Sequence, residues 1–188
     1  MLAIFMAEKI PTTLTYLEII DGSFERKKAD VAGTYFVEKI TQPSYEFYIY
    51  LYDRAGSTYN WTARKLMPKQ ELLNSIHDPK VEIFTLIYDG KIAGYVELDF
   101  RESHQAEVAY FGIFPEFQGL RLGPLLLNWA TNYAWSQPAF KRLWVHTCTL
   151  DHPKALSVYQ RAGFNIYKTE TELVDALPEN YAIPTISL

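Results

Sequence analysis

Residues 106–123 read AEVAYFGIFPEFQGLRLG, and this order predicts a strand, a glycine-containing turn and the start of a helix. The strand is expected to stop at Pro115, because proline cannot donate a hydrogen bond to a sheet. At a helix start, free backbone N–H groups converge on one spot, and the helix dipole adds about half a positive charge there. Such a turn can bind a phosphate, although an ordinary tight turn uses the same residues.

The segments on either side of this stretch predict a mixed α/β fold. Residues 81–88 and 91–100 have β patterns and flank Asp89-Gly90, a pair typical of a type I′ hairpin. Other strands are expected at residues 14–20, 35–40, 143–149 and 164–171, and helices at residues 44–53, 68–76, 124–135 and 153–162. A strand is the alternative for the aromatic run of residues 44–53. This order of elements indicates a mixed sheet flanked by helices.

The composition is typical of one compact domain covering residues 1–188. Apolar residues make up 48% of the chain, which is enough for a continuous core. The 18 basic and 22 acidic side chains give a net charge of −4 and form no basic block, so no nucleic-acid partner is expected. The single cysteine, Cys148, excludes an intrachain disulfide framework and a cysteine-based zinc site.

The single cysteine and the segments described next favour a cytoplasmic location. No segment approaches the roughly 20 apolar residues that span a bilayer. The apolar residues 2–7 lack a basic segment before them and are followed at once by Glu8-Lys9, so no signal peptide and no membrane partner are predicted. No metal is expected either, because the histidines show no metal-ligand spacing.

Several motifs follow one another in the second half of the chain. The loop Gln118-Gly119-Leu120-Arg121-Leu122-Gly123 is followed by a predicted strand, then by His152-Pro153-Lys154-Ala155, Tyr159 and Gly163-Phe164. This order resembles the GNAT superfamily of acetyl-CoA-dependent N-acetyltransferases. The pyrophosphate loop of that superfamily reads Arg/Gln-x-x-Gly-x-Gly/Ala, and an Asn-x-x-Ala segment, a helix tyrosine and a Gly-Phe pair follow it. The resemblance covers residues 81–171.

The resemblance implies a fold and a cofactor site. The fold would be a mixed, mostly antiparallel sheet of about six or seven strands, with the cofactor core in residues 81–171 and acceptor-side elements in residues 10–80. Pantetheine would insert like an extra strand, and the phosphates would lie on the loop. The implied acetyl-CoA site consists of Phe111, Gly112, Ile113, Gln118, Gly119, Leu120, Arg121, Leu122, Gly123, Pro124 and His152.

Ordinary strand pairing is the alternative for the strand residues of this site. Glu107, Ala109, Phe111 and Ile113 alternate along the predicted strand, and they would do so whether or not a ligand bound there. The resemblance, and not the alternation, therefore carries the pantetheine prediction.

Three residues in or near the loop affect how it would bind phosphate. Arg121 replaces the middle glycine of the family pattern, and it costs about 1–2 kcal/mol if the loop needs a positive φ there. Its charge either lies near the CoA phosphates or is solvated. Pro124, expected at the first helical position, has no N–H, so the phosphates would use the amides of residues 118–123. His152 stands where the family often has asparagine, and Asp151 beside it is expected to cap the next helix.

A general base is expected because an alkyl amine with a pKa near 10.4 costs about 4–5 kcal/mol to deprotonate at pH 7. Glu107 lies eleven residues before Gln118, the spacing at which histone-acetylating members of the superfamily carry their catalytic glutamate. Glu97 and Asp99 lie on one face of the preceding predicted strand and are rivals for this role. Structural salt bridging is the alternative for each carboxylate.

The resemblance assigns the general acid to Tyr159, which would protonate the departing thiolate. A strand amide near Ile113 would polarise the acetyl oxygen. The aromatic run that ends at Trp61, with Arg64 nearby, either lines the acceptor pocket or packs in the core; in a pocket, Arg64 would hold a substrate carboxylate. Cys148 is expected to be a buried thiol, because a nearby histidine on the same strand lacks an orienting third group.

Together these residues predict an N-acetyltransferase that moves the acetyl group of acetyl-CoA to a primary amine of a small molecule or peptide by direct attack. A non-catalytic acyl-CoA sensor with the same fold is the alternative, and the substitutions at Arg121 and His152 favour it. The sequence leaves open which amine is the acceptor and whether the protein forms a homodimer.

Overall fold

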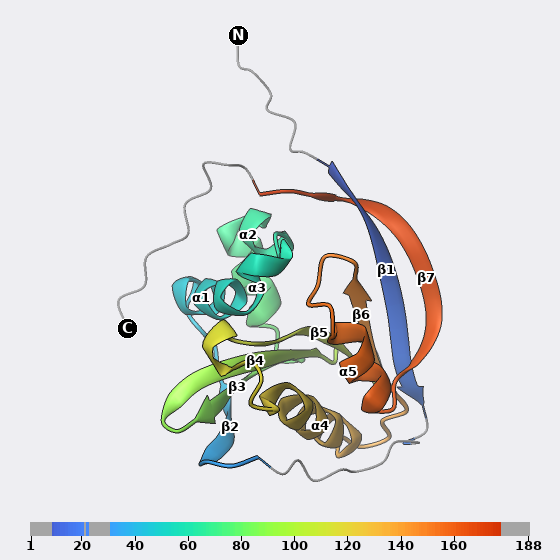
Figure 1. Ribbon diagram of the computed structural model, residues 1–188. Helices are drawn as coiled ribbons and strands as arrows, with labels where there is room; N and C mark the ends of the chain where they lie inside the picture. The colour runs from blue at the N-terminus through green and yellow to red at the C-terminus, as the bar shows by residue number, and fades with distance from the viewer. Residues whose placement is uncertain (1–8, 21, 23–30, 178–188) are drawn as a thin grey trace.

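A seven-stranded sheet in the order β2-β3-β4-β5-β6-β1-β7 forms the centre of the computed structural model, which describes residues 9–20, 22 and 31–177 (Figure 1). Its strands are β1 (Lys9–Ile20), β2 (Tyr35–Ile40), β3 (Val81–Tyr88), β4 (Lys91–Asp99), β5 (Gln105–Ile113), β6 (Arg142–Cys148) and β7 (Asn165–Asp175). All neighbouring strands are antiparallel except β5 and β6. This confirms the mixed, mostly antiparallel sheet.

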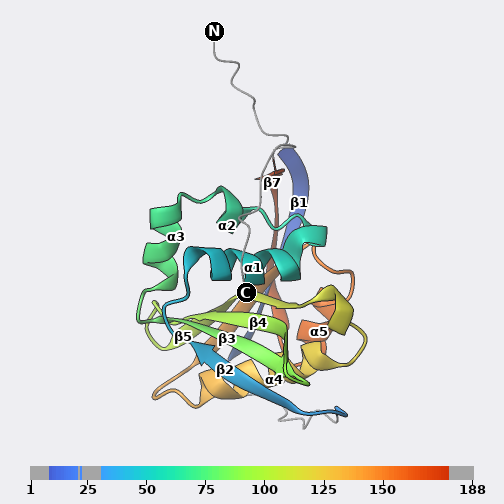
Figure 2. The same ribbon diagram turned by 90° about the vertical axis from the view of Figure 1, so that its left-hand side faces the viewer.

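Helices cover both faces of the sheet (Figures 1 and 2). One face carries α1 (Tyr45–Gly56), α2 (Ala63–Leu66) and α3 (Lys69–Ile76), and the other carries α4 (Leu122–Trp135) and α5 (Ala155–Arg161). The core under α4 and α5 is largely aliphatic, with Leu126 and Val145 almost fully buried, whereas the core under α1 and α3 is built on tyrosines such as Tyr48 and Tyr95. The two faces of the sheet therefore differ in chemistry.

Local signals explain several of these elements. Asp89 and Gly90 have φ values of 46° and 77°, as a type I′ turn between β3 and β4 requires. Ser44 caps α1 by accepting a hydrogen bond from the amide of Phe47 at 3.1 Å, so residues 45–56 form a helix and not a strand. Helix α4 begins at Leu122, two residues before Pro124, which corrects the expected start; proline is tolerated there because it lies in the first turn.

Strand β1 lies between β6 and β7 and is antiparallel to both (Figure 1). The sequence predicted a strand at residues 14–20 but not its place in the sheet. The expectation that residues 10–80 hold the acceptor-side elements stays a prediction. Helices α1 to α3 cover one face of the sheet, whereas β1 completes the sheet beside the second half of the chain.

Strands β5 and β6 pair only at their beginnings and then separate. Their parallel pairing runs from Gln105 opposite Arg142 to Glu107 opposite Trp144, and it does not continue beyond these residues. Figure 1 shows the two strands diverging from this point. The separation leaves one edge of β5 and one edge of β6 without a neighbouring strand.

A bulge at Ala109 changes which side chains of β5 share a face. In the pairing with β4, Val108 lies opposite Leu98 and Tyr110 lies opposite Glu97, so Ala109 is the extra residue. Val108 and Phe111 consequently pack on the α4 and α5 side, whereas Tyr110 packs under α1. The regular alternation expected from Glu107 to Ile113 is therefore wrong.

Candidate functional site

A cavity of about 850 Å³ lies where β5 and β6 separate. Its walls come from β5 residues 108–113, from the last residues of β6, from the start of α4 and from α5. Residues 59–63, residues 66–68 and residues 172–175 of β7 enclose the other side. The cavity thus extends from the start of α4 to the segment that holds α2.

The loop before α4 presents unused backbone donors to this cavity. The amides of residues 119–123 have no acceptor within the described part of the chain. The amide of Gln118, in contrast, donates to the carbonyl of Pro115 at 3.2 Å, so it is removed from the predicted set of phosphate donors. Free amides at the start of a 14-residue helix form an anion-binding arrangement.

The loop needs left-handed backbone conformation at two positions. Gly119 has φ of 86°, and Arg121, which precedes the first residue of α4, has φ of 61° and ψ of 16°. The family pattern has glycine at the position of Arg121, and this conformation gives the physical reason. Arginine takes this conformation at a cost of about 1–2 kcal/mol, so the substitution strains the loop.

Backbone groups on the open edge of β5 alternate in direction. The amide of Phe114 donates to the carbonyl of Ala93 on β4 at 2.8 Å, so Gly112, two residues earlier, also directs its peptide groups to β4. The peptide groups of Phe111 and Ile113 face the separation from β6. The predicted pantetheine partners therefore reduce to Phe111 and Ile113, while Gly112 allows close packing: a Cβ there would lie 2.7 Å from the Cβ of Ala55.

Tyr159 of α5 lines the cavity and is almost completely buried. Its ring contacts Phe111 and Phe164 with centroid distances of 6.0 and 5.8 Å. The phenol oxygen has no hydrogen-bond partner in the described residues. Burial, together with the negative charge of Asp151, raises the pKa of Tyr159 above its usual value, so the phenol keeps its proton at neutral pH.

Glu107 lies at the last paired position of β5, below the cavity and not on its wall. One of its carboxylate oxygens is 3.2 Å from Nδ1 of His146, which does line the cavity. The predicted base thus lies next to a histidine for which no catalytic role is expected from the sequence. Any proton transfer from the cavity to Glu107 by this route passes through His146.

The two other carboxylates predicted as bases are held in internal ion pairs. Glu97 is fully buried, and its oxygens accept hydrogen bonds from Arg64 and Tyr48, both at 2.5 Å. Burial raises the pKa of Glu97, against the attraction of Arg64. Asp99 forms a bidentate ion pair with Arg101, with two N–O distances of 2.9 Å. None of these residues lines the cavity.

Arg64 therefore does not line the cavity, where it was expected to hold a substrate carboxylate. It is 7% exposed, and besides Glu97 its guanidinium contacts Ser75 at 3.1 Å and lies over the ring of Tyr110 at 5.0 Å. These contacts fix the segment of α2 to the sheet. A substrate carboxylate in the cavity does not meet this guanidinium, because Tyr110 lies between the cavity and the core.

Trp61 lines the cavity, as its predicted role in the acceptor pocket requires. Its indole N–H donates to Asp151 at 2.9 Å, and Thr62 beside it donates to the carbonyl of Asp175 at 3.0 Å. Two hydrogen bonds thus join the segment before α2 to the loop after β6 and to the end of β7. We call residues 59–63 the roof segment.

Asp151 does not cap α5, which corrects the expectation from the sequence. Its carboxylate accepts hydrogen bonds from Trp61, from the hydroxyl of Thr147 at 2.7 Å and from the amide of Cys148 at 3.0 Å. Helix α5 has no side-chain cap. Asp151 therefore anchors the turn after β6 and the roof segment at the same time.

His152 lies on the cavity wall, where the resemblance places a cofactor contact. Its Nδ1 accepts a hydrogen bond from the amide of Lys154 at 3.0 Å, and its ring meets the ring of Tyr59 edge-on at 5.6 Å. Nε2 has no partner in the described residues. This arrangement leaves one ring nitrogen for a ligand.

Comparison with known proteins identifies the family. The model of the acetyltransferase (GNAT) family matches residues 35–164. The chain belongs to the GNAT family. The matched segment contains the separated strands β5 and β6, the loop before α4 and Tyr159, whereas β1 and β7 lie outside it.

Solved structures of GNAT proteins share this fold at low sequence identity. A GCN5-related N-acetyltransferase from Kribbella flavida is 19% identical, with a TM-score of 0.60 over 89% of this chain and 60% of its own. A tandem GNAT protein from the clavulanic acid biosynthesis pathway is 16% identical, with a TM-score of 0.63 over 93% of this chain and 56% of its own. This chain therefore spans less than two thirds of either structure.

A third solved structure is an aminoglycoside acetyltransferase from an uncultured soil metagenomic sample, in complex with sisomicin. It is 15% identical, with a TM-score of 0.55 over 69% of this chain and 87% of its own. No curated protein matches the chain.

Charged side chains of this GNAT cavity differ between its two ends. Arg121, Lys154 and Arg161 line the side formed by α4 and α5, near the free amides of the loop. Glu71 of α3 and Asp175 of β7 line the opposite side. The basic side suits phosphates, which is where the GNAT pattern puts those of CoA.

Cys148 also lines the cavity, two residues after His146 on β6. Burial raises the pKa of its thiol, and so does the nearby charge of Asp151. The thiol therefore stays protonated at neutral pH and is a poor nucleophile. It is only partly buried, so the expectation of a fully buried thiol is not met.

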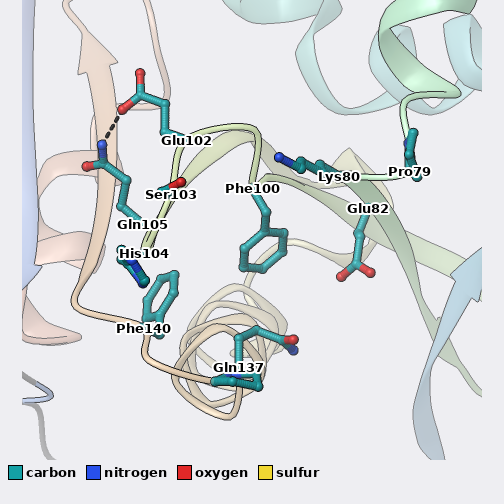
Figure 3. Close-up of a pocket in the computed structure, with 11 residues that line it drawn as sticks. Pro79, Lys80, Glu82, Phe100, Glu102, Ser103, His104, Gln105, Gln137 and Phe140 are labelled. Carbon is teal, nitrogen blue, oxygen red and sulfur yellow. Dashed lines mark hydrogen bonds between the residues drawn. The ribbon is translucent and has the colours of Figure 1, made fainter.

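A second hollow of about 270 Å³ lies away from this site, between the β4–β5 turn and the end of α4 (Figure 3). Phe100 and Phe140 form its apolar side, and His104 lies between the turn and Phe140. Across residues 9–20, 22 and 31–177, no group of three or more metal-ligating side chains is present. Within the same residues, no helix is long and apolar enough to cross a membrane.

Proposed function

We propose that this GNAT protein transfers the acetyl group of acetyl-CoA to a primary amine of a small molecule or peptide. The observation that carries the proposal is the separation of β5 from β6 above Glu107, together with the unused amides of residues 119–123 at the end of the opening. An extended chain with phosphates at one end fits both features, because an open strand edge binds extended chains and free helix amides bind anions.

The residues around the opening would have separate tasks. Phe111 and Ile113 would pair with the extended pantetheine through the peptide groups that face the opening, where the carbonyl of Ile113 accepts a hydrogen bond from the side-chain amide of Gln118 at 3.3 Å. The loop amides with Arg121 would hold phosphates. Acetyl-CoA supplies the acetyl thioester. Tyr159, on the α5 side, would give its proton to the departing sulfur. The amine would enter from the side of the roof segment, on the other face of the sheet.

Calorimetry with acetyl-CoA tests the binding half of this proposal. Acetyl-CoA should bind, and acetyl-pantetheine, which lacks the phosphates of CoA, should bind at least about tenfold more weakly because it loses the loop contacts. The exposed Leu120 offers a matched pair of variants. Leu120→Asp should weaken acetyl-CoA binding more than Leu120→Asn, since only the aspartate repels phosphates. Absence of heat with millimolar acetyl-CoA refutes the cofactor assignment.

Transfer is tested by measuring free thiol released from acetyl-CoA with a panel of alkyl amines, polyamines, aminoglycosides and peptides with free N-termini. Amine-dependent thiol release, with the acetylated amine found by mass spectrometry, supports the transferase. Tight binding of acetyl-CoA without transfer to any amine favours the non-catalytic acyl-CoA sensor. The strained Arg121 in the phosphate loop is the feature that keeps the sensor as a second candidate.

A further inference from the structure

His146 and Glu107 face each other where β5 and β6 separate. Trp144 is the last residue of β6 that pairs with β5, and it lies opposite Glu107. His146 follows two residues later, on the same face of β6, because side chains alternate along a strand. Its Nδ1 is 3.2 Å from Oε1 of Glu107 across the opening. The pair therefore lies at the closed end of the opening.

The geometry of the pair leaves Nε2 of His146 available to a ligand. His146 lines the cavity and Glu107 does not. The side chain of His146 is 41% exposed and that of Glu107 is 21% exposed. When the Nδ1–H group of the neutral ring donates a hydrogen bond to Glu107, the lone pair of the ring lies on Nε2. Nε2 has no hydrogen-bond partner in the part of the chain described here.

The pair also lies on the face from which an amine would approach. Leu143 and Val145 of β6 pack in the core under α4 and α5, so Trp144 and His146 point to the opposite face. That face carries α1, Tyr110 and the roof segment. Tyr159 packs on the α4 and α5 side. A reacting group between β5 and β6 would thus have a phenol on one side and an imidazole on the other.

We propose that His146 is the catalytic base that takes the proton from the acceptor amine, and that Glu107 is a positioning residue that holds the His146 ring. This inference rests on the proposed function, because it requires an amine as the acceptor. It differs from the role expected for Glu107, whose carboxylate would have taken the proton directly or through water.

The proton and bond changes balance in this scheme. The amine nitrogen forms a bond to the acetyl carbonyl carbon, and the carbon–sulfur bond breaks. An amine that arrives in its ammonium form loses one proton to Nε2 of His146 before it attacks, and His146 becomes an imidazolium beside the carboxylate of Glu107. After the carbon–nitrogen bond has formed, the nitrogen loses a second proton to water. Tyr159 gives one proton to the thiolate. Proton exchange with water restores both side chains.

The charged and titratable groups around His146 favour its role as a base. The hydrogen bond to Glu107 raises the pKa of His146 above its usual 6.5, and the carboxylates of Asp151 and Glu172 add to the effect while partial burial opposes it. Tyr16 of β1 faces the ring at 5.7 Å, and its phenol stays neutral because its pKa is raised by a hydrogen bond to Glu170. Cys148 on the same strand also stays neutral. A base with a pKa near the working pH is effective.

The main test compares two substitutions of histidine by asparagine. His146→Asn keeps a side-chain N–H that can reach Glu107 but removes the base. His104→Asn is the control, since His104 lies in the second hollow and its left-handed backbone is one that asparagine tolerates. With the best amine of the panel at pH 7, His146→Asn should lower kcat by about 100-fold or more and leave acetyl-CoA affinity unchanged. The control should stay within about twofold of the wild type.

The pH profile distinguishes a base from a side chain that only shapes the cavity. In the wild type, kcat/KM for the amine should fall tenfold per pH unit below the pKa of His146, because the base is then protonated, and should be level above it. In His146→Asn it should rise tenfold per pH unit up to the pKa of the amine, near 10.4 for an alkyl amine. The difference between the two proteins therefore shrinks as the pH is raised.

Glu107→Gln tests the positioning role with a readout that does not need turnover. The Hε1 proton of His146, assigned by its absence from the His146→Asn spectrum, should titrate in wild-type NMR spectra with a pKa above 6.5. In Glu107→Gln that pKa should fall toward 6.5, and the acid limb of the rate profile should move with it. An unchanged pKa overturns the positioning role of Glu107.

The outcomes separate this inference from the proposed function. An active wild type whose His146→Asn variant keeps its rate and its pH profile overturns the role of His146 and leaves the transferase intact. A wild type that binds acetyl-CoA and acetylates no amine overturns the transferase, and the role of His146 with it. An equal loss of rate at pH 7 and pH 9 in His146→Asn also overturns the role of His146 as the base. At high pH, solvent deprotonates more of the amine, so the loss of a base should matter less there.

Discussion

Strand β6 has two edges, and the protein uses them differently. Toward β1, β6 pairs over its whole length, from Arg142 opposite Ile20 to Cys148 opposite Leu14. Toward β5 it pairs only from Arg142 to Trp144, and the rest of that edge faces the cavity. One strand therefore has a closed edge, which contributes to stability, and an open edge, which is available to a ligand.

The two edges also differ in where their partners come from. The open edge lies within residues 35–164, which match the GNAT family. The closed edge depends on β1, which lies outside the matched residues. The site and its support therefore come from different parts of the chain, so substitutions should separate activity from stability.

The largest effect is expected from Tyr159→Phe, in the α5 wall of the cavity beside the open edge. It should lower kcat by about 100- to 10,000-fold, because the departing thiolate loses its proton donor. Stability should change little, since the removed hydroxyl has no partner in the described residues and replacing it leaves no donor or acceptor unsatisfied. Turnover and thermal unfolding are measured together, with acetyl-CoA affinity as the control. Unchanged turnover would remove Tyr159 from the mechanism.

Leu17→Ala on the closed edge should have the opposite signature. Leu17 of β1 is completely buried between Val145 of β6 and Ile166 of β7 in the strand order. Its truncation should lower the free energy of unfolding by about 2–5 kcal/mol, through lost apolar burial and the cavity left behind. Denaturant unfolding measures this loss. The activity per folded molecule, measured well below the melting temperature, should stay close to that of the wild type; a large fall there would break the separation of the two edges.

Trp61→Phe tests how the roof segment is held over the open edge. The substitution removes the indole N–H that donates to Asp151, and a hydrogen bond to a charged group contributes about 1.5–3 kcal/mol. We expect a higher KM for the amine and a lower melting temperature. Trp129→Phe is the matched control, because Trp129 of α4 packs against Phe84 and Tyr133 and does not line the cavity. Equal effects of the two variants on KM would exclude a special role for the roof segment.

The smallest effect is expected at Arg121. Glycine relieves the left-handed strain of about 1–2 kcal/mol but adds about 0.5–1 kcal/mol of backbone freedom to the unfolded chain. Arg121→Gly should therefore stabilise the protein by about 0.5–1 kcal/mol in denaturant unfolding. Arg121→Ala removes the same charge and keeps the strain, so weaker acetyl-CoA binding in both variants would assign that loss to the charge. A destabilised Arg121→Gly would contradict the strain.

Sequence reasoning succeeded where the signal is local. The turn at Asp89-Gly90 depends on two neighbouring residues, and the hairpin expected there is confirmed. The helix preferred for residues 44–53 is also confirmed, over Tyr45–Gly56. The loop before α4 was predicted for the same reason, because its glycines and the following apolar run are adjacent in sequence. In that loop, α4 begins at Leu122 and the Gln118 amide donates to Pro115, and both differ from the expectation.

The remaining features depend on contacts between distant residues. Glu97 and Arg64 are 33 positions apart, and nothing near either residue indicates that burial joins them. Glu107 and His146 are 39 positions apart and meet only because β5 and β6 are parallel neighbours. The bulge at Ala109 is likewise set by pairing with β4 and cannot be read from β5 alone. Alternation along one strand therefore predicted the wrong faces.

The place of β1 in the sheet has a consequence for how the chain folds. Its residues are made by the ribosome well before β6 and β7, and its contacts with them join distant residues such as Tyr16 and Glu170, which are 154 positions apart and share a hydrogen bond. Contacts of such long range slow folding, because a large loop must close before they form. We therefore expect residues 81–135 to fold early on the ribosome, while β1 stays unpaired until β6 and β7 have emerged and closes the sheet last.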